Sequence, residues 1–177
     1  FEGYLSNIEN KEKKESLQEH LLKQKGFLAQ KVPENMMEFF IYSLDRNGYL
    51  REESIDEVTN IFAEYTKEQI KEFITYMQQM EPTGVFARNL QECMILQLQE
   101  LDFKYKKECI KIVKEHIQLL ADNKLLEISK KENISLEKIT ECVKTIRGLN
   151  PKPGSQYATD AAYMDCEVEV LAEEKGL

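Results

Sequence analysis

"MEPTGVFARNLQECMILQL", residues 80 to 98, sets a turn-forming Pro82-Thr83-Gly84 segment directly before a strong helical pattern. Proline cannot donate a helical hydrogen bond and moves its predecessor out of the α region, so the preceding helix is predicted to stop at Glu81. Asn89 lies three residues before Glu92, an arrangement that satisfies free N–H groups at a helix start. The stretch therefore predicts a turn that joins two helices.

Helical spacing of apolar residues continues in both directions from this turn, and sustained strand alternation is almost absent. Helices are expected near residues 16–25, 34–44, 54–63, 67–80, 89–101, 106–121, 124–132 and 136–148. Further capping pairs are Ser16 with Glu19, Ser54 with Glu57 and Thr66 with Gln69, and further stops are 45–48 and Asn150-Pro151. The sequence thus predicts an all-α fold.

The first half of the chain resembles the second half in three blocks that keep their order. Leu17, Glu19 and Gln24 match Leu90, Glu92 and Gln97 at an offset of 73 residues. Residues 37–50 match 113–126 at an offset of 76, and 68–82 match 137–151 at an offset of 69. Because shared helical period does not explain the matched Gln, Glu and Pro positions, we infer two related bundles that arose by internal duplication.

This repeat divides the chain into four parts. Residues 1–15 are expected to be a tail or linker, 16–84 a first helical subdomain, and 85–154 a second. Residues 155–177 are expected to be a linker or the start of a next element, because "YMDCEVEVLAEE", from Tyr163, alternates briefly as a short strand does.

Composition favours a protein partner. The chain has 177 residues, is 42% hydrophobic and 32% charged, and carries a formal net charge of −8. A chain this acidic is a poor candidate for wrapping nucleic acid by counterion release. It is long enough to bury a core, as expected for one domain or two small lobes.

The four cysteines, Cys93, Cys109, Cys142 and Cys166, show no metal-ligand spacing and are interpreted as reduced thiols of a cytoplasmic protein. No apolar run approaches the roughly 18 residues that span a bilayer, and no signal peptide is recognisable, so no membrane association is expected. Because Phe1 is not an initiator methionine, we expect a fragment of a longer protein.

An enzyme is not expected. His20 and His116 are isolated in the sequence, and nucleotide-binding and nucleophile motifs are absent. "DRNGYL", from Asp45, has two letters of a calcium loop but lacks the glutamate at the twelfth position, so a helix-to-helix turn with Gly48 at positive φ is favoured. No catalytic residue, metal, cofactor or small-molecule substrate is therefore predicted.

Two alternatives stay open in the second half. Residues 125–147 can form a helix-turn-helix that binds DNA, although the outward face of its second helix contains two acids, and core packing of Ile139, Cys142, Val143, Ile146 and Leu149 explains the pattern more simply. The helix at 89–101 carries Gln97 inside a stripe of Leu90, Cys93, Met94, Leu98 and Leu101. That stripe is either core or a seam for a partner, and Arg88 and Arg147 either bond their own turns or contact the partner.

Four stretches in one order identify a resemblance. "EPTGVFARNLQECMILQL" and "IRGLNPKPGSQY", with "SLQEHLLKQ" at 16–24 and "FIYSLDRNGYL" at 40–50, resemble the core-binding region of the bacterial sigma-54 family of enhancer-dependent RNA polymerase sigma factors. The resemblance implies an all-helical domain of two subdomains that binds core RNA polymerase for transcription initiation. For the full-length factor it also implies promoter DNA and an ATP-driven activator as partners. Phe86 departs from it, standing where the family often has a small residue, and so does Cys166-Glu167, where the family usually has Pro-Asp.

These observations select candidate site residues. The residues expected to contact core polymerase are Arg88, Asn89, Gln91, Glu92, Gln97, Arg147 and Lys152. The residues expected to shape turns are Gly48, Pro82, Gly84, Pro151, Pro153 and Gly154. Charge reversal at Arg88 is expected to weaken binding of polymerase without loss of helical structure.

Overall fold

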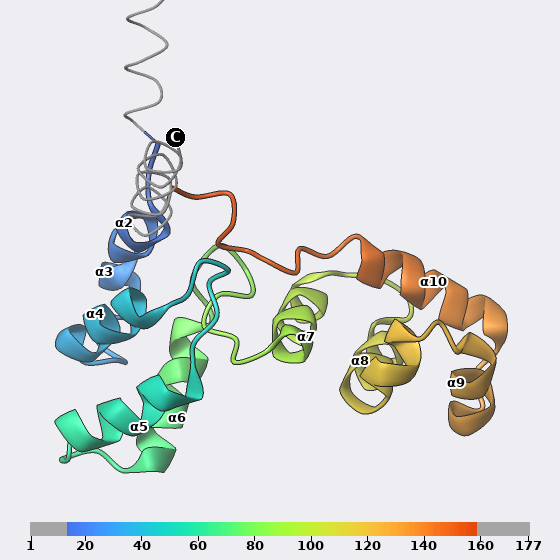
Figure 1. Ribbon diagram of the computed structural model, residues 1–177, viewed down its shortest axis with the longest axis horizontal. Coiled ribbons are helices and arrows are strands. Elements are labelled where there is room, and N and C mark those ends of the chain that lie inside the picture. Colours follow the sequence, from blue (N-terminus) through green and yellow to red (C-terminus); the bar gives the residue numbers. More distant parts are fainter. Residues whose placement is uncertain (1–13, 159–177) are drawn as a thin grey trace, which may run out of the picture.

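The computed structural model describes residues 14–158, and these are helical with loops between (Figure 1). The helices are α2 (Leu17–Leu22), α3 (Lys25–Leu28), α4 (Glu34–Ser43), α5 (Glu52–Ile61), α6 (Lys67–Met77), α7 (Leu90–Glu100), α8 (Lys106–Ala121), α9 (Leu125–Glu132) and α10 (Leu136–Arg147). Within residues 14–158 the only β pairings are isolated bridges, so the predicted all-α class is confirmed. The short strand predicted from Tyr163 lies outside the described residues.

Three predicted helix starts are confirmed by a capping side chain that bonds a backbone N–H three residues later. Ser16 and Thr66 each form the full reciprocal box, with Glu19 and Gln69 respectively. The Asn89 side chain accepts from the backbone N–H of Glu92 at 2.8 Å. Local sequence thus determines where α2, α6 and α7 begin.

Two predicted helices differ from the structure. The helix expected at 54–63 begins at Glu52, and Ser54 is no cap but a buried residue inside α5, because the Ile55 and Val58 face packs into the core. The helix expected at 16–25 is divided, since α2 ends at Leu22 and α3 begins at Lys25, with Lys23 and Gln24 in a turn between them.

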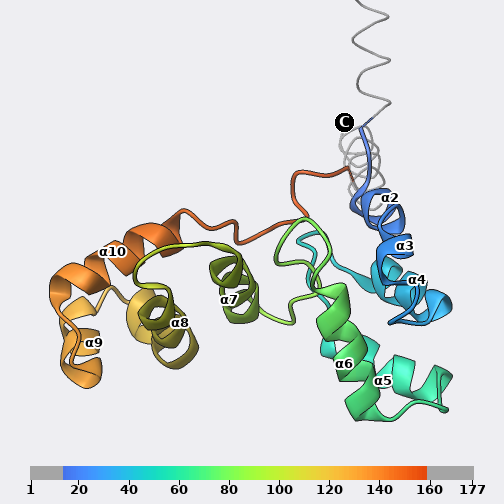
Figure 2. The same cartoon turned by 180° about the vertical axis from the view of Figure 1, so that it is seen from behind.

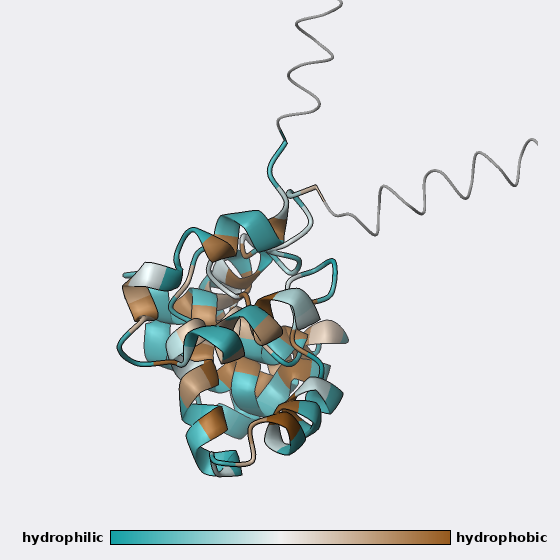
Figure 3. Ribbon diagram, turned by 90° about the vertical axis from the view of Figure 1, so that its left-hand side faces the viewer, coloured by the Kyte–Doolittle hydropathy of each residue, from teal (hydrophilic) through white to brown (hydrophobic). Residues whose placement is uncertain are grey.

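The helices form two lobes, each around its own apolar core (Figures 1 and 2). In the first lobe, α2 to α6 surround side chains that include Leu21, Met37 and Phe40. In the second, α8 packs against α7, α9 and α10 around Ile112, Ile139 and other residues. The helices carry both polar and apolar residues, as amphipathic helices that pack on a small core do (Figure 3).

The chain between the lobes belongs partly to the first core. Val85 and Phe86 are fully buried there, one and two residues beyond the expected subdomain boundary at residue 84. The division into subdomains at that boundary remains a prediction. Burial of the large Phe86 side chain ties the connecting segment to the first lobe.

Candidate functional site

Three loops meet between the lobes, and we call residues 45–50, 80–88 and 149–154 the junction. Backbone hydrogen bonds join them: Phe86 N–H donates to Gly48 O, Leu50 N–H to Ala87 O, and Gly154 N–H to Asn47 O, each at 2.9 Å. The junction contains all the residues predicted to shape turns. It therefore determines how the two lobes are held together.

Three glycines let the loops of the junction approach closely. Gly48 and Gly84 have φ values of 88° and 103°, which confirms the positive φ predicted for Gly48. A Cβ added at Gly154 would lie 2.8 Å from both Arg46 O and Gly48 N, and one at Gly84 would lie 2.7 Å from Cys93 Sγ. Only glycine fits these positions without a shift of the neighbouring atoms.

The junction contains three prolines, Pro82, Pro151 and Pro153. The Glu81–Pro82 peptide bond is cis, and the preceding helix α6 already ends at Met77. Pro151 accepts a hydrogen bond from the Tyr49 hydroxyl, and Pro153 is buried. The prolines therefore belong to loops that contact each other across the junction, rather than standing directly at helix ends.

Two glutamine side chains hold the junction in the same way. Gln24 accepts from Glu81 N–H at 2.8 Å and donates to Glu81 O at 2.7 Å. Gln97 accepts from Asn150 N–H at 2.8 Å and donates to Asn150 O at 2.6 Å. Each amide thus satisfies both backbone groups of one residue, as a neighbouring strand would. We call these pairs the two amide clamps.

Replacing Gln97 with alanine should lower the free energy of unfolding by about 1–2 kcal/mol, because two hydrogen bonds to Asn150 are lost. Gln97→Glu should cost at least as much, since a carboxylate cannot donate to Asn150 O. Urea unfolding followed by circular dichroism measures both effects. Gln99→Ala, at an exposed position of the same helix, is the control and should leave stability nearly unchanged; equal losses for Gln97→Ala and Gln99→Ala would contradict the clamp.

Arg88 and Glu92 form a two-point ion pair at the start of α7. Arg88 donates from Nε and Nη2 to the Glu92 carboxylate, both at 3.1 Å, and from its backbone N–H at 2.8 Å. Gln78 donates to the same carboxylate at 2.9 Å. Burial raises the pKa of Glu92, but the hydrogen bonds from Arg88 and Gln78 outweigh it and leave that pKa below its ordinary value. Arg88 and Glu92 therefore stabilise the junction of this chain.

Gln91 connects α7 to α8. Its side-chain amide donates to Val113 O at 2.9 Å and to Lys114 O at 2.6 Å. Both carbonyls lie just before His116, where the backbone of α8 leaves helical geometry. Gln91 thus satisfies carbonyl groups near the break in α8.

Arg147 and Lys152 are exposed on either side of Asn150, and they differ from the other candidates, whose side chains bond groups within this chain. Beside them α7, α10 and the junction line a groove of about 450 Å³. Its lining residues are Thr83, Gln97, Glu100, Leu101, Lys144, Thr145, Gly148, Leu149 and Asn150. The sequence singled out Gln97 and Leu101 but not the groove itself, because residues from 83 to 150 meet there only after folding.

The stripe on α7 is partly core and partly surface. Cys93 and Leu98 are fully buried, and burial raises the pKa of the Cys93 thiol. Leu90 and Leu101 are each 41% exposed, at the two ends of the helix. The core interpretation holds for the middle of the stripe, while Leu101 forms part of the groove.

The helix-turn-helix predicted at 125–147 is present as α9 and α10, with Asn133 in the left-handed region between them. The residues predicted to pack, Ile139, Cys142, Val143, Ile146 and Leu149, do lie in or against the second core. The outward face of α10 includes Glu137 and Glu141, whose negative charges disfavour contact with DNA phosphates.

Two sequence interpretations of polar residues have clear outcomes. Asp45 uses Oδ1 to accept from the N–H groups of Asn47 and Tyr49, both at 2.9 Å, as the predicted turn requires. Both histidines, which are isolated in the sequence, have a carboxylate neighbour in the fold: His20 lies 3.3 Å from Glu15 and His116 lies 2.6 Å from Glu132. The second pair is separated by 16 positions, so sequence spacing did not reveal it.

Among the described helices, none is both long and apolar enough to cross a membrane.

The fold and the junction define an all-helical, two-lobed module. A family model described as "Sigma-54 factor, core binding domain" matches residues 7–177, and the chain belongs to this family.

Curated relatives agree with the family match. The chain is 29% identical to an RNA polymerase sigma-54 factor of Pseudomonas aeruginosa over 88% of its length and 33% of the relative. It is 36% identical to that of Bacillus subtilis over 68% of its length and 27% of the relative. It is 31% identical to that of Rhodobacter capsulatus over 81% of its length and 33% of the relative. The chain thus spans about a third of the length of these relatives.

Proposed function

We propose that this chain binds core RNA polymerase as part of a sigma-54-type transcription initiation factor, by protein–protein contact and without catalysis of its own. The family match over residues 7–177 carries the proposal. Relatives named RNA polymerase sigma-54 factor support it. In a full-length factor, promoter DNA and an ATP-dependent activator are further partners; this part rests on the family resemblance alone.

The subdomains of this function are proposed as 16–84 and 85–154, flanked by a tail or linker at 1–15 and a linker or next element at 155–177. The two separate cores support the division, and the two amide clamps support the internal duplication. Gln24 and Gln97 are 73 positions apart, and the residues they clamp, Glu81 and Asn150, are 69 apart, which are the offsets of the sequence repeat.

For the contact with polymerase we favour Arg147 and Lys152 over the other predicted residues. Both are exposed beside the groove, and Gln97 holds the backbone between them. Asn89, Gln91, Glu92 and Gln97 have partners within this chain. Arg88 is 34% exposed yet bonds Glu92, so its charge reversal is expected to lower stability as well as binding, which replaces the expectation from the sequence that the fold would be unaffected.

A double charge reversal, Arg147→Glu with Lys152→Glu, should weaken binding of core polymerase about tenfold, mostly through slower association, because rim charges steer encounter. Binding of the 177-residue chain to purified core polymerase by biolayer interferometry measures the effect. The loss should shrink as salt is raised. Circular dichroism and melting should stay unchanged, since both side chains are exposed.

The pair Lys71→Glu with Lys130→Glu, at exposed positions on α6 and α9, is the charge-matched control. Equal weakening by this pair would point to net charge rather than to this surface. Absence of any binding by the wild-type chain would refute the proposed function. A gel shift with promoter DNA separates the helix-turn-helix alternative, because sequence-specific binding by this chain alone would favour it.

A further inference from the structure

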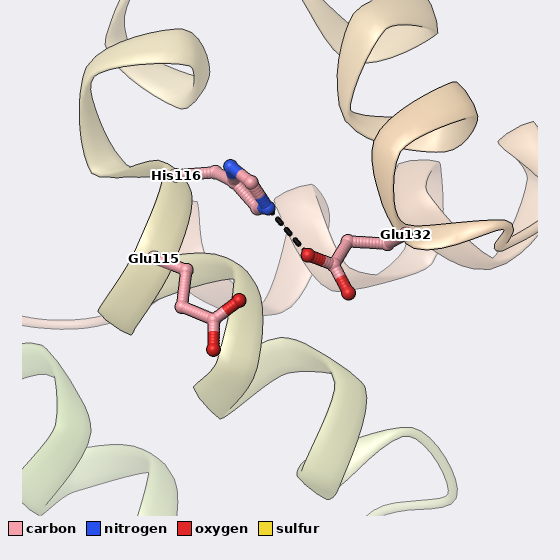
Figure 4. A group of neighbouring side chains, drawn as sticks. All are labelled: Glu115, His116 and Glu132. Carbon is pink, nitrogen blue, oxygen red and sulfur yellow. Dashed lines mark hydrogen bonds and ion pairs between the residues drawn. The ribbon is translucent and has the colours of Figure 1, made fainter.

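A histidine and two glutamates converge where α8 meets the end of α9 (Figure 4). His116, Glu132 and Glu115 each offer one donor atom, and these atoms lie within 4.8 Å of one another. We propose that they form a binding site for a divalent transition-metal ion, with Zn²⁺ as its best fit. The sequence analysis predicted no metal.

Glu132 is the anchor of the site. It is the last residue of α9, and its side chain is only 9% exposed. Oε1 faces His116 Nε2 at 2.6 Å, and Oε2 faces Lys111 Nζ at 2.6 Å. Both carboxylate oxygens of Glu132 are thus already oriented, one toward the His116 ring and the other toward Lys111. A metal ligand of this kind is present before any ion arrives.

The break in α8 brings the other two donors together. Consecutive residues of a regular helix point in different directions and do not meet. His116 has φ −129° and ψ 29°, outside the helical region, and neither proline nor glycine stands in α8 to cause this. The carboxylate of Glu115 consequently lies on the same side as the His116 ring (Figure 4).

The donor set selects the kind of metal. One imidazole nitrogen with two carboxylate oxygens suits Zn²⁺ and similar ions, whereas Mg²⁺ prefers oxygen alone. Tetrahedral Zn²⁺ with bonds of about 2.0–2.1 Å holds its ligand atoms roughly 3.3 Å apart. The His116–Glu132 separation would thus widen by less than an ångström, and Glu115, which is exposed, would swing inward.

Metal binding at this site needs no reactant other than the ion and water. The metal replaces the proton on His116 Nε2, which passes to Nδ1 or to water. Lys111 keeps its bond to Glu132 Oε2 and so orients the carboxylate without touching the metal, as residues that hydrogen-bond metal ligands do. Water completes the fourth position. The ion would fasten α8 to α9 and so stabilise the second lobe.

Titration of the 177-residue chain with ZnCl₂ by isothermal calorimetry tests the proposal. A Cys166→Ser background removes the one thiol outside the described residues, because thiolates also bind zinc. We expect one ion per chain and a rise of several degrees in melting temperature, since binding to the native state alone stabilises it. CoCl₂ should give the visible absorption of a tetrahedral site.

Glu132→Gln and His116→Gln should each weaken zinc binding at least tenfold, and Glu115→Gln several-fold. Glu115 is exposed and its side chain makes no hydrogen bond within residues 14–158, so Glu115→Gln keeps the proposal testable if the other two variants unfold. Glu137→Gln and His20→Gln are matched controls and should bind zinc as the parent does. Absence of stoichiometric binding, or equal weakening by a control, would overturn the site.

Discussion

Phe86→Ala should lower the free energy of unfolding by about 3–5 kcal/mol, which is among the largest effects expected for a single change within residues 14–158. Phe86 is fully buried among the side chains of the first core, although it belongs to the segment that connects the lobes. Removing its ring leaves a cavity in the first core. Urea unfolding followed by circular dichroism measures the loss.

A glycine at the same position separates the two roles of Phe86. Its φ of 64° is in the left-handed region, which costs a bulky residue about 1–2 kcal/mol. Phe86→Gly removes the same ring but relieves this strain, so it should be about 1 kcal/mol more stable than Phe86→Ala. The reverse order would show that backbone conformation at residue 86 is not strained.

Phe27→Ala is the matched control, because Phe27 is 80% exposed on α3. Its effect on stability should be within about 0.5 kcal/mol. A large loss for Phe27→Ala would mean that the measured losses report phenylalanine removal in general, rather than burial at the junction.

Gly154→Ala should cost about 2–3 kcal/mol, because its methyl group would press on the backbone of the 45–50 loop. The added Cβ meets Arg46 O and Gly48 N at 2.8 Å and Asn47 C at 2.9 Å, and backbone atoms cannot rotate away as side chains do. The shift should also break the hydrogen bond from Gly154 N–H to Asn47 O. Hydrogen exchange should therefore quicken at the amides of Phe86, Leu50 and Gly154.

Gly26→Ala provides the control within the same chain. A Cβ at Gly26 meets nothing within 4 Å, and the residue lies in α3, where alanine is favoured over glycine by about 0.5–1 kcal/mol. Gly26→Ala should therefore be neutral or stabilising. Unchanged exchange at the junction in Gly154→Ala would contradict the close packing of the loops.

Features that depend on neighbouring positions were predictable from the sequence. The starts of α2, α6 and α7 followed from Ser16, Thr66 and Asn89, because a cap and its partner are three residues apart. Ser54 has the same signature, yet it is buried within α5. The core contacts of that helix outweighed the local signal, because burial of an apolar face contributes more than one cap.

The site depended on contacts that no local pattern encodes. Of the seven residues predicted to bind polymerase, Arg88 bonds Glu92 only four positions away, but Arg88 precedes the cap of α7, so helical spacing could not indicate this pair. The clamp from Gln97 to Asn150 joins residues 53 positions apart. The sequence repeat matched Gln24 with Gln97 but could not say what either side chain binds.

The sequence by itself determined that the chain is helical, where most helices begin, and which family it belongs to. The spacing of apolar residues and the capping side chains act over a few positions, and the family motifs are present in the sequence itself. Tertiary structure alone decided that Gln24 and Gln97 clamp the junction across 57 and 53 positions, and that His116 meets Glu132. Such contacts form only when burial of two apolar cores brings distant polar groups within hydrogen-bonding distance, where each must find a partner.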